Sequence, residues 1–237
     1  MADDAPTATA DEYEQDGPVA KRIASVIPYY KYKGIDRFYD INGFLTRPDI
    51  FQEVIDVFAA RYRGKKVDSI GGFDARGFVL GPPLALALKV PFFMLRKPGK
   101  MPNAVGSAAY SVEYGKREGM CIPRGHPLSK TDPLNGSSVV KPGDSVLLVD
   151  DLVATGGTLS SGIDLVRGMG GTVLECACVV ELTCFTDPPP ESGLPSRKKT
   201  WIDKGIWDVP VWGLISEKVL TLAGEVPDGY VDDGEEH

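Results

Sequence analysis

The sequence SVLLVDDLVATGGT, residues 145–158, carries the strongest indication of the fold class. Its first part, SVLLV, is a continuous apolar run, which is typical of a strand buried on both faces of a sheet. A turn with two consecutive glycines follows, and we expect a helix at Thr158–Met169 that ends at the next glycine pair. A second long strand is expected at Thr172–Leu182. Strand, helix and strand in this order predict a βαβ unit.

The sequence on either side of this unit extends the same alternation. Residues 46–64 have apolar side chains at helical spacing, a proline in the first turn and a glycine at the end, which together predict an amphipathic helix. A strand at Val67–Gly71, a helix at Gly77–Lys89 and a strand at Val90–Leu95 follow. Trp201–Leu220 is expected to hold a final strand and a short helix. The chain is therefore predicted to be α/β, with a mainly parallel twisted sheet flanked by helices.

Charge and composition predict one domain between two tails. Residues 1–18 contain acidic side chains, no Lys or Arg and no apolar periodicity, so we expect a flexible acidic tail there. The domain is expected to span residues 19–225, and residues 226–237 form a second acidic tail. Within the domain, residues from about 97 to 144 are rich in Gly, Pro, Ser and Lys. A segment of this length is too long for a simple connection and predicts a flexible, functional loop.

Several classes of protein are disfavoured by composition. The formal net charge is −7, yet residues 21–227 taken alone have a balance of +4, so the acidity belongs to the tails. Four cysteines without C-x-x-C spacing and two histidines give little material for a zinc site or a Ser-His-Asp triad. We find no long apolar run and no signal-peptide pattern at the N-terminus. These features predict a cytoplasmic protein without a nucleic-acid or membrane partner.

The residues after the SVLLV run combine two kinds of chemistry. Asp150 and Asp151 follow a predicted strand at its carboxyl end, where open α/β sheets bind ligands. The next residues offer backbone N–H groups, hydroxyls and a helix N-terminus, which suit a phosphate; they are Ala154, Thr155, Gly156, Gly157 and Thr158. The two carboxylates would repel that phosphate, but they suit ribose hydroxyls, with a divalent metal ion beside them to offset their charge. The sequence fits neither a Walker A loop nor a G-x-G-x-x-G fingerprint.

This stretch resembles the phosphoribosyl pyrophosphate (PRPP) motif of the type I phosphoribosyltransferases. Further segments resemble the adenine phosphoribosyltransferase family in the same order and at similar spacing, namely GFDARGF at 72–78, LRKPGK at 95–100, YSVEYG at 110–115, and LEC with VEL within 174–182. The resemblance runs from about Gly34 to Leu182. It implies the type I fold, with a small hood built from residues of about 19–45 and a flexible catalytic loop.

The resemblance also implies an activity in purine salvage. The reaction would convert adenine and PRPP to AMP and pyrophosphate, with Mg²⁺ carried mostly by PRPP and touched by Asp150 and Asp151. The family relationship further implies a cytoplasmic homodimer.

Individual roles follow residue by residue from the same resemblance. Glu113 would be the acid/base at the adenine, with Tyr114 in the PRPP and AMP site. The leaving pyrophosphate would face four cations, which are Arg76, Arg96, Lys97 and Lys100. The segment GIDRFYDI at 34–41 would select the base. It has Tyr39 where relatives often have arginine, so Arg37 is the candidate adenine contact.

Two alternatives remain open at this stage. The first is a PRPP-binding regulator that has lost catalysis; the acidic ends and the lack of a helix-turn-helix before the domain disfavour it. The second is a phosphoribosyltransferase for a 6-oxopurine, which the GFDARGF and SVEYG segments disfavour. The role of the long 117–141 stretch is not predicted.

Overall fold

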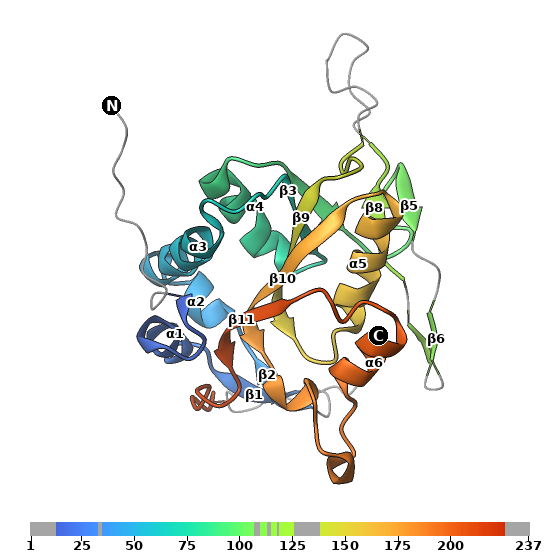
Figure 1. Cartoon of the computed structure of the whole chain (residues 1–237). Coiled ribbons are helices and arrows are strands. Elements are labelled where there is room, and N and C mark those ends of the chain that lie inside the picture. Colours follow the sequence, from blue (N-terminus) through green and yellow to red (C-terminus); the bar gives the residue numbers. More distant parts are fainter. Residues whose placement is uncertain are drawn as a thin grey trace, which may run out of the picture. The chain divides into compact units, whose positions relative to one another are not determined.

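The structure is a computed structural model that describes residues 13–32, 35–106, 110–112, 115–117, 119–125 and 138–225. The chain divides into two compact units, one formed by Met1–Arg61 with Leu214–His237 and the other by Tyr62–Gly213. Figure 1 labels the elements of both units, and each is described below by itself. Among the residues that the structure describes, no helix combines the length and the apolar character needed to cross a bilayer.

A five-stranded sheet is the centre of the larger unit (Figure 1). Its strands lie in the order β11-β10-β9-β3-β4, with β3 at Ser69–Phe73, β4 at Phe92–Leu95, β9 at Ser145–Val153, β10 at Thr172–Glu181 and β11 at Val211–Ser216. The pairs β3–β4, β3–β9 and β9–β10 are parallel. Helix α4, Gly77–Leu88, connects β3 to β4, and α5, Gly157–Gly168, connects β9 to β10. The predicted α/β fold with a mainly parallel sheet is confirmed.

Two glycines allow the helices to pack closely on the sheet. A Cβ atom on Gly77 would lie 2.6 Å from the carbonyl oxygen of Val149, so the start of α4 lies directly against β9. A Cβ atom on Gly162 would lie 2.5 Å from the ring of Phe73, which brings α5 onto the end of β3. Buried apolar side chains of β3, β4, β9, β10 and α5 form one core around these contacts.

The stretch expected as a long loop contains paired strands. Antiparallel strands β5, Ala104–Gly106, and β8, Cys121–Pro123, pair with each other, and so do β6, Tyr110–Val112, and β7, Gly115–Arg117. Arg96 also forms an isolated bridge with Cys121. Residues 107–109, 113, 114, 118 and 126–137 of this stretch lie outside the described part, so its flexibility stays a prediction.

The last third of the larger unit differs from the prediction. Over Trp201–Leu220 we expected a strand followed by a short helix, and this order is wrong, because helix α6, Arg197–Asp203, comes first and β11 follows it. The side chain of Ser196 caps this helix by accepting the backbone N–H of Lys199 at 3.1 Å. Trp201 is fully buried and anchors the helix in the core. Short 3-10 turns at Thr183–Phe185 and Pro190–Ser192 precede it.

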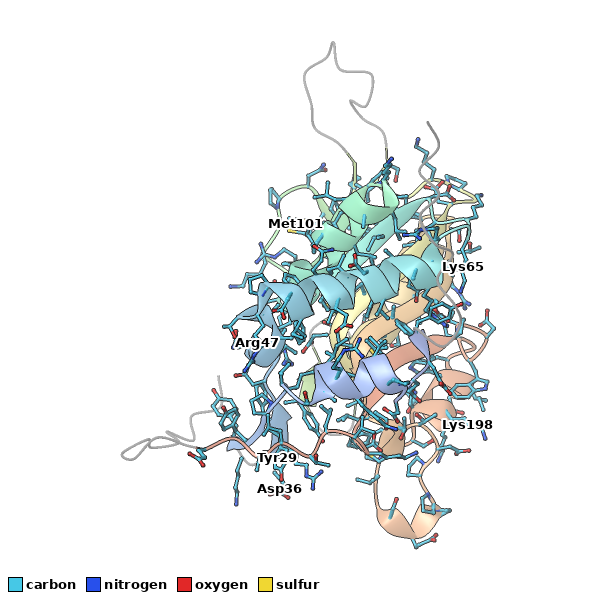
Figure 2. The ribbon with its side chains drawn as sticks, turned by 90° about the vertical axis from the view of Figure 1, so that its left-hand side faces the viewer. Tyr29, Asp36, Arg47, Lys65, Met101 and Lys198 are labelled. Carbon is cyan, nitrogen blue, oxygen red and sulfur yellow. The ribbon has the colours of Figure 1, made fainter. Side chains whose placement is uncertain are left out.

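The smaller unit contains helix α1, Pro18–Ala24, the antiparallel strands β1, Tyr29–Tyr32, and β2, Ile35–Tyr39, and the helices α2, Asn42–Leu45, and α3, Pro48–Tyr62. Helix α3 confirms the prediction made from residues 46–64. Figure 2 labels Tyr29 and Asp36 on the two strands of the hairpin. The C-terminal segment continues this sheet, since the N–H of Tyr29 donates to the carbonyl of Leu222 and the N–H of Gly224 donates to that of Tyr29.

Asp16, which was expected in the N-terminal tail, makes hydrogen bonds within the smaller unit. The carboxylate of Asp16 accepts hydrogen bonds from the backbone N–H of Ser216 at 2.7 Å and from its hydroxyl at 2.6 Å. Residues 13–18 are therefore held within the smaller unit. Residues 1–12 of the predicted N-terminal tail lie outside the described residues, as do residues 226–237, the predicted C-terminal tail.

Candidate active site

Two adjacent carboxylates lie at the carboxyl end of the central strand. Strand β9 continues four residues beyond the predicted Val149, so Asp150 and Asp151 belong to the strand itself. The Asp151 residue is only 3% exposed, and a carboxylate oxygen of Asp150 accepts the backbone N–H of Asp151 at 3.0 Å. The sheet thus fixes both side chains at the edge where open α/β sheets bind ligands.

The turn after β9 has the backbone geometry of an anion site. Gly156 has φ +72° and is the N-cap of α5, a conformation that favours glycine. A Cβ atom at Gly156 would also lie 2.9 Å from both the Arg197 Cδ and the Trp201 Nε1. No side chain caps the first turn of α5, so its N–H groups can bind an anionic ligand. The residues predicted as a phosphate cradle, Ala154 to Thr158, form this turn and the first two residues of α5.

Arg76 joins the carboxylates through the close packing of α4 on β9. It is the N-cap of α4, and its guanidinium forms an ion pair with Asp151 at 2.9 Å. The arginine side chain is 39% exposed, whereas that of Asp151 is 4% exposed. One face of the guanidinium thus neutralises a buried acid while the group stays open to solvent and to a ligand.

Arg96 directly follows strand β4, which lies beside β3 in the sheet. Its Nε donates to the carboxylate of Asp74 at 2.9 Å, and its Nη1 donates to the carbonyl of Lys100 at 3.0 Å. The guanidinium also lies 5.8 Å from the ring centre of Phe78. Lys97 is exposed, as is Lys100. Strands β9, β3 and β4 are adjacent and parallel, so their carboxyl ends lie at one edge of the sheet. The acid pair lies near the end of β9, Arg76 follows β3, and Arg96 follows β4.

Burial makes the ionised form of Asp150 and Asp151 unfavourable. Burial raises the pKa of Asp150 well above its ordinary value, and the charge of Asp151 raises it further. Burial also raises the pKa of Asp151, while the charge of Arg76 opposes that rise. Groups that stabilise the ionised pair, such as sugar hydroxyls or a cation, are therefore the ligands that this edge favours.

We expect Asp150→Asn to stabilise the ligand-free protein at alkaline pH. The folded state resists ionisation of Asp150, so the wild type loses stability as the pH rises above the ordinary pKa of aspartate. Asparagine removes this charge and keeps an oxygen for the Asp151 N–H. The melting temperature of the variant should exceed that of the wild type at about pH 8, and the difference should shrink toward about pH 4.

Asp203→Asn is the matched control, because Asp203 is an exposed aspartate of α6. Its melting temperature should follow that of the wild type at both pH values. A lower melting temperature for Asp150→Asn than for the wild type at the alkaline pH would contradict this account of the acid pair.

A metal ion at this edge would need oxygen atoms from the ligand. Among the described residues there is no group of three or more His, Cys, Asp and Glu side chains that could hold a metal ion. Two neighbouring carboxylates, one of them paired with Arg76, can supply at most part of a coordination shell. This donor set fits Mg²⁺ that is carried mainly by a diphosphate.

The described structure does not test three other predicted site residues. Glu113 and Tyr114 lie outside the described residues. Arg37 belongs to β2 of the smaller unit, where its guanidinium lies 4.7 Å from the ring centre of Tyr29. Tyr39, at the position where relatives often have arginine, is 3% exposed and packs edge-on against Tyr29. The roles of Glu113, Tyr114 and Arg37 stay predictions.

Four residues near the site were given no role in it from the sequence. Asp74 accepts a hydrogen bond from Arg96. Arg197 and Trp201 donate to carbonyl groups of the turn after β9, and Glu181 forms an ion pair with Arg197. Arg197 begins the segment RKK, a pattern typical of a solvated basic surface, yet it is 2% exposed. Only the tertiary contacts distinguish it from its lysine neighbours.

Comparison with known proteins agrees with this geometry. The family model for the phosphoribosyl transferase domain matches residues 41–214. Adenine phosphoribosyltransferase 2 of Arabidopsis thaliana is 42% identical over 175 residues, which cover 72% of this chain and 83% of the relative. Adenine phosphoribosyltransferase of Neisseria meningitidis is 40% identical over 167 residues, covering 70% of this chain and 80% of the relative.

Solved structures show the same relationship. Adenine phosphoribosyltransferase of Leishmania tarentolae superposes with a TM-score of 0.74 at 27% identity, covering 90% of this chain and 94% of that one. The Trypanosoma brucei enzyme, solved in complex with AMP, pyrophosphate and ribose-5-phosphate, superposes with a TM-score of 0.71 at 26% identity, covering 95% and 93%.

The fold, the acid pair and the glycine turn thus define a protein of the type I phosphoribosyltransferase class. Within that class the relatives that match over most of their length carry one name. The chain belongs to the adenine phosphoribosyltransferase family.

Proposed function

We propose that this protein transfers the phosphoribosyl group of PRPP to adenine and releases AMP and pyrophosphate, a purine salvage reaction. The observation that carries the proposal is the arrangement at the end of β9. There, two carboxylates, one paired with Arg76, precede the N-terminus of α5, whose first turn has no side-chain cap. We propose adenine as the base because the chain belongs to the adenine phosphoribosyltransferase family.

In this proposal the end of β9 and the start of α5 bind the ribose 5-phosphate part of PRPP. The backbone N–H groups and hydroxyls of residues 154–158 hold the 5′-phosphate, since a helix N-terminus favours negative charge. Asp150 and Asp151 accept hydrogen bonds from the ribose hydroxyls. Their negative charge also stabilises the positive charge that develops on the sugar as the bond to pyrophosphate breaks.

The cations at the ends of β3 and β4 face the pyrophosphate. Arg76 and Arg96 are positioned by Asp151 and Asp74, so their guanidinium groups are preorganised for a diphosphate. Lys97 and Lys100 are exposed and act as additional cations. Mg²⁺ carried by the diphosphate would neutralise part of its charge, and Asp150 and Asp151 are the residues that would hold it.

The remaining roles rest on the family relationship. Glu113 acts as acid/base at the imidazole edge of adenine, with Tyr114 beside it, and Arg37 contacts the base. Closure of the loop from about 97 to 144 would exclude water and prevent hydrolysis of PRPP. Residues of about 19–45 form the hood. A cytoplasmic location is part of the same proposal, supported by the buried free thiols Cys121, Cys176 and Cys178.

An assay of four bases tests this function. The purified protein is incubated with Mg²⁺, PRPP and adenine, hypoxanthine, guanine or xanthine. We expect AMP and pyrophosphate in equal amounts from adenine and little product from the other three. Nucleotide formed from hypoxanthine or guanine instead would indicate a 6-oxopurine enzyme. Binding of PRPP without product from any base would indicate the regulator.

The exposed apolar side of α4 supports a homodimer as part of this proposal. Helix α4 contains no charged residue, and Leu86 on it is 80% exposed, while Val79 is 36% and the neighbouring Met94 of β4 is 40% exposed. An apolar helix surface of this kind is typical of an interface between subunits.

Leu86→Glu should therefore reduce the molar mass in solution. We expect light scattering to give about twice the chain mass of 25.5 kDa for the wild type and the single-chain mass for the variant, because a buried charge opposes association. Ile202→Glu alters another exposed apolar residue, 52% exposed on α6, and should leave the dimer intact. A dimer that persists in Leu86→Glu would place the interface elsewhere.

A further inference from the structure

We propose that Arg197 is a positioning residue that holds the phosphate-binding turn in its binding conformation, together with Trp201. The inference rests on the proposed function only in taking the turn after β9 as the 5′-phosphate site. Arg197 would touch neither substrate; it would act through the backbone of that turn.

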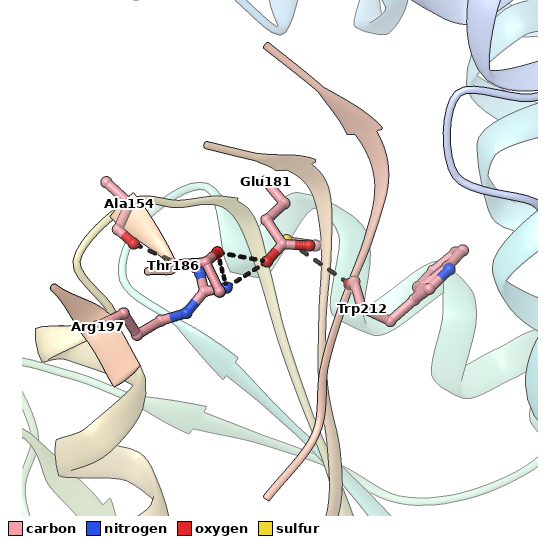
Figure 3. Close-up of polar contacts among 6 residues, drawn as sticks. Ala154, Glu181, Thr186, Arg197 and Trp212 are labelled. Carbon is pink, nitrogen blue, oxygen red and sulfur yellow. Dashed lines mark hydrogen bonds and ion pairs between the residues drawn. The ribbon is translucent and has the colours of Figure 1, made fainter. Parts of the chain in front are cut away.

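The guanidinium of Arg197 connects the turn to the end of β10 (Figure 3). Its Nη1 donates to the carbonyl of Ala154 at 3.4 Å, and its Nη2 donates to the hydroxyl of Thr186 at 2.7 Å. The same Nη2 forms an ion pair with the carboxylate of Glu181, the last residue of β10. One planar group therefore links three separate segments.

Burial makes this arrangement rigid. The side chain of Arg197 is 2% exposed and that of Glu181 is 10% exposed. A buried guanidinium is costly unless it keeps its partners, so it holds them firmly, and its planar fork fixes their directions. Since Glu181 neutralises its charge, Arg197 contributes little attraction for an anion by itself. Its effect is the geometry it imposes on Ala154.

The direction of the Ala154 carbonyl sets the direction of the next N–H group. In a planar trans peptide the C=O of one residue and the N–H of the next point in opposite directions. Because Arg197 holds the carbonyl of Ala154, the N–H of Thr155 points away from Arg197. If this peptide turned over, the carbonyl oxygen would face a bound phosphate and repel it.

Trp201 makes a similar contact with the turn, to the carbonyl group two residues after Ala154. The carbonyl of Gly156 accepts Nε1 of Trp201 at 3.4 Å and the backbone N–H of Ser160 at 2.9 Å, so the N–H of Gly157 points to the opposite side. The side chains of Arg197 and Trp201 also occupy the space where a Cβ atom at Gly156 would lie. Helix α6 therefore contacts the carbonyl groups of Ala154 and Gly156. The N–H groups on the other side of these two peptides, those of Thr155 and Gly157, belong to the predicted cradle.

The test compares Arg197→Met with Arg167→Met. Arg167 of α5 makes the same kinds of contact, to the carboxylate of Asp208 at 2.7 Å and to the carbonyl of Gly205 at 3.2 Å, and neither partner belongs to the turn. Binding of ribose 5-phosphate is measured by calorimetry, and KM for PRPP, KM for adenine and kcat are measured with the melting temperature.

We expect Arg197→Met to raise both the Kd for ribose 5-phosphate and the KM for PRPP by about tenfold or more, with KM for adenine changed less than about twofold. Arg197→Lys, which keeps a donor for some of the partners, should recover part of the affinity. Arg167→Met should keep wild-type affinities even if its melting temperature falls. Thr186→Val removes the 2.7 Å partner of Arg197 and the 3.5 Å hydrogen bond from Thr186 to Glu181, and it should raise the same two constants by a smaller factor. This variant replaces Arg197→Met in the test if Arg197→Met does not fold.

Unchanged Kd for ribose 5-phosphate in folded Arg197→Met, or in Thr186→Val if the first variant does not fold, would overturn the inference. So would an equal loss in Arg167→Met, because the effect would then be one of general stability. Failure of the wild type to bind ribose 5-phosphate would overturn it as well. Failure of the wild type to form AMP while it still binds ribose 5-phosphate would count against the proposed function alone, and the binding constants would still decide on Arg197.

Discussion

An Asp151→Asn variant is expected to lose about 10²–10³-fold in kcat/KM for PRPP, the range found when a preorganised polar group at a transition state is removed. Asp151 is buried, fixed on β9, and paired with Arg76 at 2.9 Å. Asparagine keeps the shape but removes the negative charge that stabilises the developing cation on the sugar. It also replaces the ion pair with Arg76 by a contact to a neutral amide, which weakens the hold on the guanidinium.

Steady-state kinetics with PRPP varied at saturating adenine measure this effect. Asp203→Asn, the exposed aspartate of α6, is the control for a general change in charge and should behave as the wild type. Near wild-type kcat/KM for PRPP in Asp151→Asn would remove Asp151 from the phosphoribosyl site.

Glu113→Leu is the second substitution with a large expected effect. The family resemblance places Glu113 at the imidazole edge of adenine, and loss of a general acid/base lowers a rate by about 10²–10⁴-fold. We expect kcat to fall within this range while the Kd for PRPP, measured without adenine, changes less than about twofold.

Glu191→Leu, at an exposed glutamate of the 3-10 turn Pro190–Ser192, is the matched control and should retain kcat. Equal losses in kcat and in PRPP affinity for Glu113→Leu would move Glu113 out of the catalytic role. The same comparison with Glu113→Gln separates loss of the proton-accepting group from loss of side-chain volume.

The alternation of strands and helices was predictable because the strands of a covered parallel sheet are apolar throughout. SVLLV and the run from Thr172 are of this kind, and both became central strands. The end of β9 was placed too early, because Asp150 and Asp151 have low strand propensity and their position is fixed by pairing with β10. The order of α6 and β11 was missed, because the burial of Trp201 comes from tertiary packing.

The candidate site could be predicted where its residues are neighbours in the sequence. The acid pair and the glycine turn are of this kind, and the structure keeps them together on β9 and α5. The ion pair of Arg76 with Asp151 and the contact of Arg197 with Ala154 join residues far apart in the chain. Such pairs depend on how α4, β9 and α6 pack, and a local pattern such as RKK contains no information about that packing.

The position of AMP in a crystal of this protein tests the account most directly. We predict that the 5′-phosphate is bound by backbone N–H groups of residues 154–158, that the ribose hydroxyls donate to Asp150 and Asp151, and that the carbonyl of Ala154 stays on Arg197. A phosphate bound away from this turn, or a ribose without contact to either aspartate, would contradict it.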